Sequence, residues 1–466
     1  MLLVRGERRE VRCIRHDGSA VRTAHRLESL FNLEQHPGSA RAESRIAGAG
    51  PAARVLAHYE ILVRSQLHYR VLVMSQVSGK NPYRPGVGVR PLYLAGREAP
   101  LRRFAAMLRA APEQQASMRV TGLRGVGKSV LLEEFADHAQ ELDWQPALLE
   151  LQPSHNTDEA LKAVLGAVLE RTRQRLSRLA RLRSVAGRAL RAASLSLTWE
   201  DVSLAVSFGS EREEDLARDL FSTVELALAK GRDGVVLLLD EAQLVRDERD
   251  RHGEHPLSLL IAPVVALQRA ELPLGLVLCG LPTLTGNLQK ARSYSERLFR
   301  GEEVDSLAPE QALEAFTRPL EQTARKTDAK LAEAVVKEVE GYPYFLQLWG
   351  SELWDAADLA GVDRFTIKLL DATRADIYGR LDRDFYEPRI ATLTPAEQDL
   401  LAASAACPYP PLRSAELNRA SEKTPGNVNV LLGRLVDAGA LYRIRKGEYA
   451  YTAPKFRDYL LRRADG

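Results

Sequence analysis

One run of residues, Gly122–Ser129, has the types and the spacing needed to hold a chain of phosphates. In the pattern GxxxxGKS, glycines let successive backbone N–H groups turn inward, the lysine reaches the β and γ oxygens, and the serine hydroxyl is placed to bind Mg²⁺. The flanking segments Met118–Thr121 and Val130–Ala136 supply the strand and the helix that this motif requires. The sequence therefore predicts ATP binding rather than an ordinary glycine-rich turn. The expected nucleotide contacts are Gly122, Leu123, Arg124, Gly125, Val126, Gly127, Lys128, Ser129 and Val130.

A second pattern supplies carboxylates. The apolar stretch Val235–Leu239 is followed directly by Asp240 and Glu241. A strand that is apolar at every position is typical of a parallel sheet covered on both faces, and such sheets bind ligands at their carboxyl ends. We expect Ser129 and Asp240 to hold Mg²⁺, Asp240 through water, and Glu241 to act as the base that polarises an attacking water. The alternative for Glu241 is a helix-start carboxylate that interacts with a helix dipole.

Several further segments indicate the elements that position these residues. Helix-like periodicity covers Leu101–Arg109, and strand-like runs are Pro146–Leu151, Leu274–Gly280 and 302–305. An unusually long interval separates the strand-like run Pro146–Leu151 from the apolar strand Val235–Leu239. In it, alternation over 194–199 and 202–208 predicts a hairpin.

The same interval contains Arg171–Arg183, which has many arginines and no acidic residue. It is typical of a basic amphipathic helix. Nucleic acid, an anionic membrane surface and an acidic protein are its possible partners, and a solvated helix face is the alternative.

The pattern changes after residue 390. Thr394 and Pro395 are a helix cap and a first-turn proline, Ser414–Ala420 is a short helix, and a third helix starts after Thr424 and ends at Gly439. Leu441–Tyr451 resembles a hairpin with Lys446 and Gly447 at its tip. Three helices and a hairpin predict a winged helix-turn-helix.

Four regions follow from these patterns. They are a poorly ordered basic extension (1–80), a nucleotide-binding domain (81–305) with an insert at about 153–213, a helical lid (306–388) and a winged helix domain (389–466). The extension contains Ala47–Ala53, which resembles a flexible segment. We also consider the hypothesis that translation starts at Met74.

Composition narrows the class of protein. The chain has 466 residues, of which 45% are apolar, and a net charge of +3, which is too small to indicate nucleic-acid binding over the whole chain. No apolar run approaches the roughly 18 residues that a membrane span needs, so we expect a cytoplasmic protein. His252 and His255 are interpreted as loop histidines. Neither a disulfide framework nor a zinc site is predicted from Cys13, Cys279 and Cys407.

Taken together, residues 80–466 resemble AAA-type P-loop ATPases of the origin-recognition-like and STAND-related groups, in particular bacterial ATP-binding proteins with a carboxyl-terminal winged helix. The resemblance implies an α/β fold with a parallel sheet ordered 5-1-4-3-2 and an all-α lid, with Pro343 touching the nucleotide. It rests on Gly122–Ser129 and Leu239-Asp240-Glu241, supported by Gly96-Arg97-Glu98, Gly280-Leu281-Pro282, Ser295–Phe299 and Gly341–Gln347.

The resemblance also implies finer roles. Arg297 or Arg300 would act as an arginine finger on a neighbouring subunit, with a surface arginine as the alternative. No arginine stands in Gly341–Gly350, where many AAA proteins have a second sensor, so oligomer-dependent hydrolysis is in doubt and the oligomeric state is open.

The winged helix has two interpretations. It would read DNA with Asn427, Asn429 and Arg434 near bases and Arg443, Arg445 and Lys446 near phosphates. Because the third helix contains Asp437 and is not strongly basic, docking of a protein or autoinhibition is the equal alternative. Three hypotheses for the whole chain remain: an ATP-driven switch, an ATP-controlled DNA-binding regulator or replication-type loader, and a nucleotide-gated scaffold with little hydrolysis.

Overall fold

A computed structural model of the chain describes residues 2–3, 12–13, 79–86, 88–182, 198–205, 208–247, 254–291, 295–421 and 423–465. The chain divides into two units, Met1–Lys80 and Asn81–Gly466. In the first unit, β1 (Leu2–Leu3) pairs antiparallel with β2 (Arg12–Cys13). The expectations of a poorly ordered extension and of a start at Met74 otherwise lie outside the described residues.

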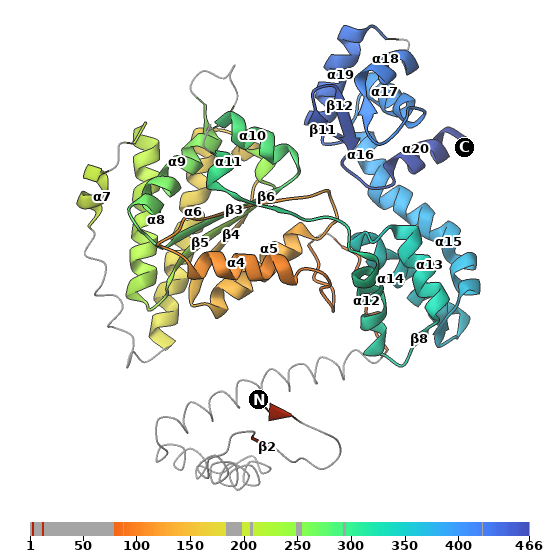
Figure 1. Ribbon diagram of the computed structural model, residues 1–466, viewed down its shortest axis with the longest axis horizontal. Helices are drawn as coiled ribbons and strands as arrows, with labels where there is room; N and C mark the ends of the chain where they lie inside the picture. Colours follow the sequence, from red (N-terminus) through yellow and green to blue (C-terminus); the bar gives the residue numbers. More distant parts are fainter. Residues whose placement is uncertain are drawn as a thin grey trace. The chain divides into compact units, whose positions relative to one another are not determined.

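The centre of the second unit is a parallel five-stranded sheet (Figure 1). Its order is β4-β5-β6-β3-β7, so the first of these strands along the chain lies between the fourth and the fifth. All neighbouring pairs are parallel, and the carboxyl ends therefore share one edge of the sheet. The strands are β3 (Ala116–Thr121), β4 (Trp144–Glu150), β5 (Gly234–Asp240), β6 (Leu274–Gly280) and β7 (Arg300–Glu303).

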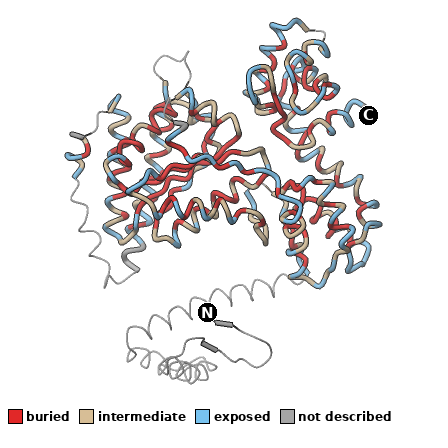
Figure 2. The backbone as a smooth tube through the Cα atoms, in the orientation of Figure 1, coloured by how far each residue is buried: buried red, intermediate tan, exposed pale blue. Residues whose placement is uncertain are grey.

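Strand β5 shows how the sheet holds two cores. Every one of its residues is buried, and successive side chains point to opposite faces. Val236 and Leu238 belong to the core that also contains Phe104 of α4 and Phe135 of α5, whereas Leu237 belongs to the other core. The strands are accordingly buried along most of their length (Figure 2). The helices of these two layers are α4 (Glu98–Arg109) and α5 (Lys128–Glu141) on one face, and α6 (Asp158–Leu182), α8 (Glu211–Ala229) and α9 (Pro256–Arg269) on the other.

The predicted hairpin before α8 is wrong where the structure describes it. After the short helix η1 (Pro153–His155) and α6, the chain forms α7 (Trp199–Ala205), a helix. Val202 is fully buried, and the Trp199 ring meets Phe221 of α8 edge-on at 5.7 Å. Trp199 and Val202 stand three positions apart, which places them on one face of α7. Their packing overrides the local alternation of apolar and polar residues.

The basic segment of α6 is partly engaged within the protein. Arg173 pairs with Glu170 at 3.0 Å and with Asp219 of α8 at 3.7 Å. It also donates to the hydroxyl of Thr223 at 3.0 Å. This arginine therefore ties α6 to α8, and a partner for the rest of the segment stays a prediction.

Four longer helices form most of the region predicted as a lid (306–388). These helices, which span residues 309–381, are here called the lid. The predicted boundary at Gly341 and Pro343 is confirmed, because one helix ends at Val339 and the next begins at Pro343. Gly341 has φ +68°, and a Cβ there would lie 2.1 Å from the carbonyl oxygen of Leu307. Only glycine fits that close approach. The elements are α12 (Pro309–Glu321), β8 (Lys326–Thr327), α13 (Ala329–Val339), α14 (Pro343–Ala360), β9 (Arg364–Phe365) and α15 (Ile367–Leu381).

Two short helices, here called the connector, lead from the lid to the last part of the chain. They are η4 (Asp382–Tyr386) and α16 (Glu387–Ala391). Tyr386 stacks on Phe456 with ring centroids 5.4 Å apart, and its hydroxyl donates to the carbonyl oxygen of Pro454 at 2.7 Å. The connector is therefore fixed to the part of the chain that follows it.

Residues 395–465, here called the carboxyl-terminal module, contain the helices and the hairpin expected from the sequence. Thr394 precedes the first helix, and its N–H donates to Glu397 at 2.9 Å, as expected of a helix start. The hairpin tip is Lys446-Gly447. The elements are α17 (Pro395–Ala405), β10 (Leu412–Arg413), α18 (Ser414–Ala420), α19 (Pro425–Asp437), β11 (Leu441–Arg445), β12 (Glu448–Tyr451) and α20 (Phe456–Asp465), with an antiparallel sheet ordered β10-β12-β11.

Among the described residues, no helix combines the length and the apolar character needed to cross a membrane.

Candidate functional site

The phosphate loop is a tight turn between β3 and α5. Gly125 and Gly127 have φ of +82° and +89°, a region that residues with a side chain rarely adopt. Gly127 precedes the first residue of α5, Lys128, so the loop runs directly into a helix amino terminus. Such a terminus presents free N–H groups and a positive dipole end, both of which favour phosphate.

Lys128 is buried beside the ends of the strands. Its ammonium donates to the carbonyl oxygen of Leu123 at 2.8 Å. Burial lowers the pKa of Lys128, and the nearby carboxylates of Glu241 and Asp240 act in the opposite direction. The lysine predicted to reach the phosphates is thus held close to the two carboxylates that the second motif supplies.

Glu241 follows the end of β5 and has a left-handed backbone with φ +53°, uncommon for a residue with a side chain. It precedes η3 (Ala242–Leu244), but its side chain makes no capping hydrogen bond. Instead its carboxylate accepts from the amide of Gln243, whose own oxygen accepts from the N–H of Leu281 at 3.0 Å. The carboxylate is therefore held by a side chain next to β6, which differs from the alternative of a simple helix-start residue.

Asp240 is almost completely buried at the end of β5. Its Oδ1 accepts from the N–H of Glu241 at 2.8 Å. The neighbouring thiol of Cys279 on β6 is fully buried, and burial raises its pKa, with the negative charge of Asp240 acting in the same direction. Ser129 and Glu241 line the cavity described next, whereas Asp240 is not one of its lining residues.

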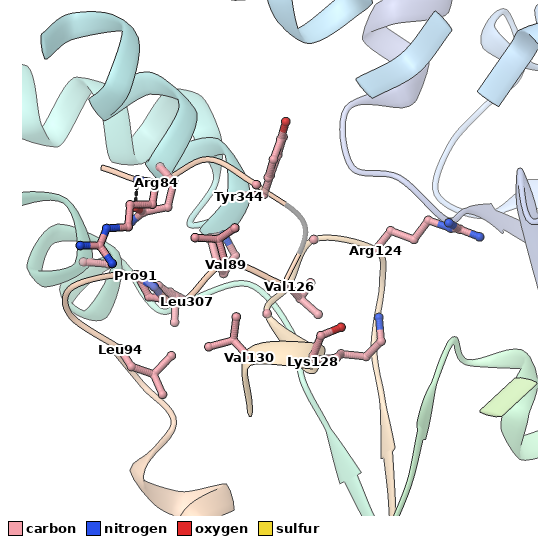
Figure 3. A pocket seen from close by; sticks show the side chains of 18 of the residues that line it. Arg84, Val89, Pro91, Leu94, Arg124, Val126, Lys128, Val130, Leu307 and Tyr344 are labelled. Atoms are coloured by element: carbon pink, nitrogen blue, oxygen red, sulfur yellow. Dashed lines mark hydrogen bonds between the residues drawn. The ribbon is translucent and has the colours of Figure 1, made fainter. Parts of the chain in front are cut away.

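A cavity of about 260 Å³ opens beside the phosphate loop (Figure 3). One part of its wall is polar and consists of the loop from Arg124 to Val130 together with Glu241. The other part is mostly apolar, as expected for a site that takes a flat base. It contains Val89, Pro91, Leu94 and Leu307 together with Tyr344 of the lid.

Two residues that the sequence analysis cited for the family resemblance also line the cavity. Pro343, the first residue of α14, is one of them. Arg97 is the other, and it donates to the carbonyl oxygens of Val126 and Asp305, each at 2.9 Å. Arg97 thus ties the phosphate loop to the chain that follows β7.

Some residues of the site carry no signal in the sequence. Arg389 of the connector lines the cavity, with its guanidinium carbon 3.9 Å from the centroid of the Phe385 ring. Tyr342, at the start of α14, has a buried hydroxyl without a hydrogen-bond partner. Gln243 holds Glu241, as described above. Tyr342 stands in the quoted run Gly341–Gln347, but no residue pattern assigned a role to any of the three, and the fold brings Tyr342 to Gly125, Arg389 to Arg124 and Gln243 to Glu241.

The other predicted site residues lie outside the cavity. Arg297 and Arg300 are exposed, in α11 (Ser295–Leu298) and at the start of β7, and neither lines the cavity. Among the described residues, no three side chains of the types His, Cys, Asp and Glu form a group that could hold a metal; His255 precedes α9, and His252 lies outside the described residues. The residues predicted near DNA are all exposed; they are Asn427, Asn429, Arg434, Arg443, Arg445 and Lys446.

Comparison with protein-family models gives two matches. Residues 93–277 match the AAA ATPase domain, and residues 383–460 match a domain of unknown function (DUF8462). The first match includes both the phosphate loop and the β5 carboxylates. A search of curated proteins found no match.

Solved structures with a similar fold include the Walker-type ATPase PABY2304 of Pyrococcus abyssi, with 18% identity and a TM-score of 0.51 over 81% of this chain and 98% of that one. The ORC1 protein of Aeropyrum pernix, solved in complex with DNA, has 17% identity and a TM-score of 0.43 over 80% and 94%. The RuvB Holliday junction branch migration motor of Thermotoga maritima has 14% identity and a TM-score of 0.37 over 79% and 95%. At these identities the likeness concerns the fold alone. The family match and the parallel sheet together support a nucleotide-binding α/β domain of the AAA type over residues 93–277.

Proposed function

We propose that this chain is an ATP-driven molecular switch, in which the presence or hydrolysis of the third phosphate changes how the lid and the carboxyl-terminal module sit on the phosphate loop. One observation carries the proposal: the backbone of that loop is held from both sides. The N–H of Tyr344 in the lid donates to the carbonyl oxygen of Gly125 at 3.3 Å. The N–H of Arg124 donates to the carbonyl oxygen of Thr452 in the module, also at 3.3 Å.

The residues present suit ATP with Mg²⁺. Backbone N–H groups at the start of α5 and the ammonium of Lys128 are donors for phosphate oxygens. The hydroxyl of Ser129 and the carboxylate of Asp240 are the hard oxygen ligands that Mg²⁺ prefers. When bound, Mg²⁺ would neutralise charge on the phosphates. In the proposed hydrolysis, Glu241 polarises the attacking water, with Gln243 fixing the orientation of its carboxylate.

The apolar part of the cavity wall supports a base-binding role. Val89, Pro91 and Leu94 precede α4, while Leu307 and Tyr344 belong to segments on either side of α12 and α13. A base held between these segments would contact both the nucleotide-binding domain and the lid. Binding would then draw the two together, which is the closing step of the proposed switch.

The first test measures ATP turnover by the purified full chain, with and without duplex DNA. Lys128→Ala supplies the background from contaminating ATPases. We expect turnover that needs Lys128. Tight ATP binding without turnover would replace the switch by a nucleotide-gated scaffold.

The second test asks whether the module responds to the nucleotide. We expect hydrogen exchange over residues 439–452 to differ between the complexes with MgATP and MgADP, because Thr452 contacts the phosphate loop. Equal exchange in the two complexes would contradict the switch even if ATP is hydrolysed.

A second candidate function, an ATP-controlled DNA-binding regulator or loader, is favoured by exposed polar and basic residues of the module. Asn427 and Asn429 are exposed near the start of α19, and Lys446 is exposed at the hairpin tip. Arg443 and Arg445 lie on the same hairpin, although Arg445 pairs with Glu448 at 2.7 Å. DNA binding that weakens steeply with salt, and weakens further in Lys446→Ala, would support this candidate. Turnover and module exchange that are both indifferent to DNA would count against it.

A further inference from the structure

One side of the cavity carries more positive charge than the phosphate motif accounts for. Besides Lys128, Arg124 and Arg389 line the cavity. Arg124 belongs to the phosphate loop, and Figure 3 shows its side chain extending away from Val89 and Leu94. Arg389 comes from α16 in the connector. Two separate elements therefore bring cations to one place.

These two cations lack a counter-charge in the part of the chain that the structure describes. The Nε atoms of Arg124 and Arg389 are buried without a hydrogen-bond partner, as is the hydroxyl of Tyr342. Asp384 also lines the cavity, but its carboxylate pairs with Arg380 at 3.3 Å. The carboxylate of Asp305 accepts from the N–H of Ser306 at 2.8 Å. Glu241 also lines the cavity, and its carboxylate accepts from Gln243, so none of these three acids forms an ion pair with Arg124 or Arg389.

Such an arrangement is unfavourable by itself. Burial lowers the pKa of Arg389, and the positive charge of Arg124 lowers it further. Half-buried cations whose Nε–H groups are buried without a partner destabilise a protein unless something compensates them. An anion that enters between the two guanidinium groups would remove both the repulsion and the unsatisfied donors.

The position of Arg124 within the loop identifies that anion. It stands between Leu123 and Gly125 in the segment that encloses a phosphate chain, and its loop ends at Lys128, the residue type that reaches the β and γ oxygens. The charge that distinguishes a nucleoside triphosphate from a diphosphate is the last phosphate. Arginine is suited to that group because its planar donors match phosphate oxygens in pairs.

Both arginines are also tied to the carboxyl-terminal module. A Cβ at Gly439, just after α19, would lie 3.2 Å from the guanidinium of Arg124. Arg389 lies three residues after Tyr386, which packs on Phe456 of α20 at a ring distance of 5.4 Å. A group bound between the two arginines would therefore act on the module at two places, near Gly439 through Arg124 and near Phe456 through the connector.

We infer that Arg124 and Arg389 together receive the terminal phosphate of a bound nucleoside triphosphate, with the hydroxyl of Tyr342 as a further donor. Arg389 is then the residue that makes the connector and the module respond to triphosphate and not to diphosphate. This inference rests on the proposed ATP binding, and it goes beyond it by assigning the distinction between ATP and ADP to a residue outside the nucleotide-binding domain.

The test is equilibrium binding of MgATP and MgADP to the full chain, measured by calorimetry. Arg389→Met removes the charge but keeps a side chain that packs on Phe385, and Arg389→Lys keeps the charge. Arg383→Ala is the matched control, because Arg383 is an exposed arginine of the same connector that does not line the cavity. Thermal unfolding without nucleotide checks that each variant folds.

We expect Arg389→Met to weaken MgATP binding about tenfold or more and MgADP binding less than about twofold. Arg389→Lys should fall between this variant and the wild type, and Arg383→Ala should match the wild type. The difference in hydrogen exchange over 439–452 between the two nucleotide complexes should also disappear in Arg389→Met.

Three results would overturn the inference. One is an unchanged MgATP affinity in Arg389→Met, and another is equal weakening of MgATP and MgADP, which would indicate a general charge effect. If the wild type binds neither nucleotide, the proposed function itself fails and the inference fails with it. If the wild type binds ATP through Lys128 and Arg389→Met behaves as the wild type, only the inference fails.

Discussion

Arg97 and Arg389 line the same cavity, and burial lowers the pKa of both, yet their surroundings differ. Arg97 donates to the backbone carbonyl oxygens of Gly96, Val126 and Asp305, at 2.9 to 3.2 Å. Arg389 has a buried Nε with no partner and a second cation, Arg124, beside it. A buried cation whose guanidinium donates to three carbonyl oxygens is part of the architecture. One that is left unbonded beside another cation is prepared for a ligand.

Lys128 lies between these two cases and should show the largest effect. Like Arg97 it is bonded to a carbonyl oxygen, that of Leu123, but its place in the motif directs it to phosphate. We expect Lys128→Ala to reduce ATP affinity about a thousandfold, below detection in most assays, because a charge-assisted contact to two phosphates is lost. Calorimetry with MgATP checks this. Retained affinity with a large loss of thermal stability would place Lys128 with Arg97 instead.

Glu241 extends the comparison from binding to chemistry. Its carboxylate lines the cavity and is oriented by Gln243. We expect Glu241→Gln to bind MgATP about as well as the wild type but to lower turnover about a hundredfold or more, because the general base is lost. Steady-state turnover measured beside binding tests this. Normal turnover in the variant would show that another group polarises the water.

Stability measurements separate the two arginines most directly. We expect Arg97→Ala to lower the free energy of unfolding by about 2 kcal/mol without nucleotide, because the carbonyl groups of Val126 and Asp305 lose their donor. Arg389→Met should change it by less than about 1 kcal/mol, since no hydrogen bond is lost. Denaturant titrations of both variants decide the matter. Equal losses would remove the distinction between an architectural and a ligand-directed arginine.

The smallest effect is expected for an exposed ion pair between the nucleotide-binding domain and the module. Arg246 follows η3, and its guanidinium pairs with Asp437 of α19 at 3.0 Å. Because both side chains are largely exposed, we expect Asp437→Ala to cost less than about 1 kcal/mol and to leave the ATP and ADP affinities unchanged. Asp437→Asn is the isosteric control. A larger loss in denaturant titrations would make this pair a main attachment of the module.

Local patterns in the sequence predicted much of the fold because they depend on neighbours along the chain. Uninterrupted apolar residues gave the prediction of a buried strand ending in Asp240, and Gly341 followed by Pro343 gave the boundary between α13 and α14. The strand Leu274–Gly280 occurs with the predicted bounds. The prediction of a hairpin around Trp199 was wrong because contacts with α8, the next helix, decide the structure of that segment.

The sequence by itself determined the phosphate loop and the two carboxylates, because each is set by residue types at fixed spacing on a strand, a turn and a helix. Only the tertiary structure brought Gln243 to β6, Tyr342 to Gly125, and Arg389 to Arg124. These residues come from separate elements, and no spacing along the chain records which side chains will meet. Unsatisfied charge is likewise visible only after folding, because it depends on which partners each group has found.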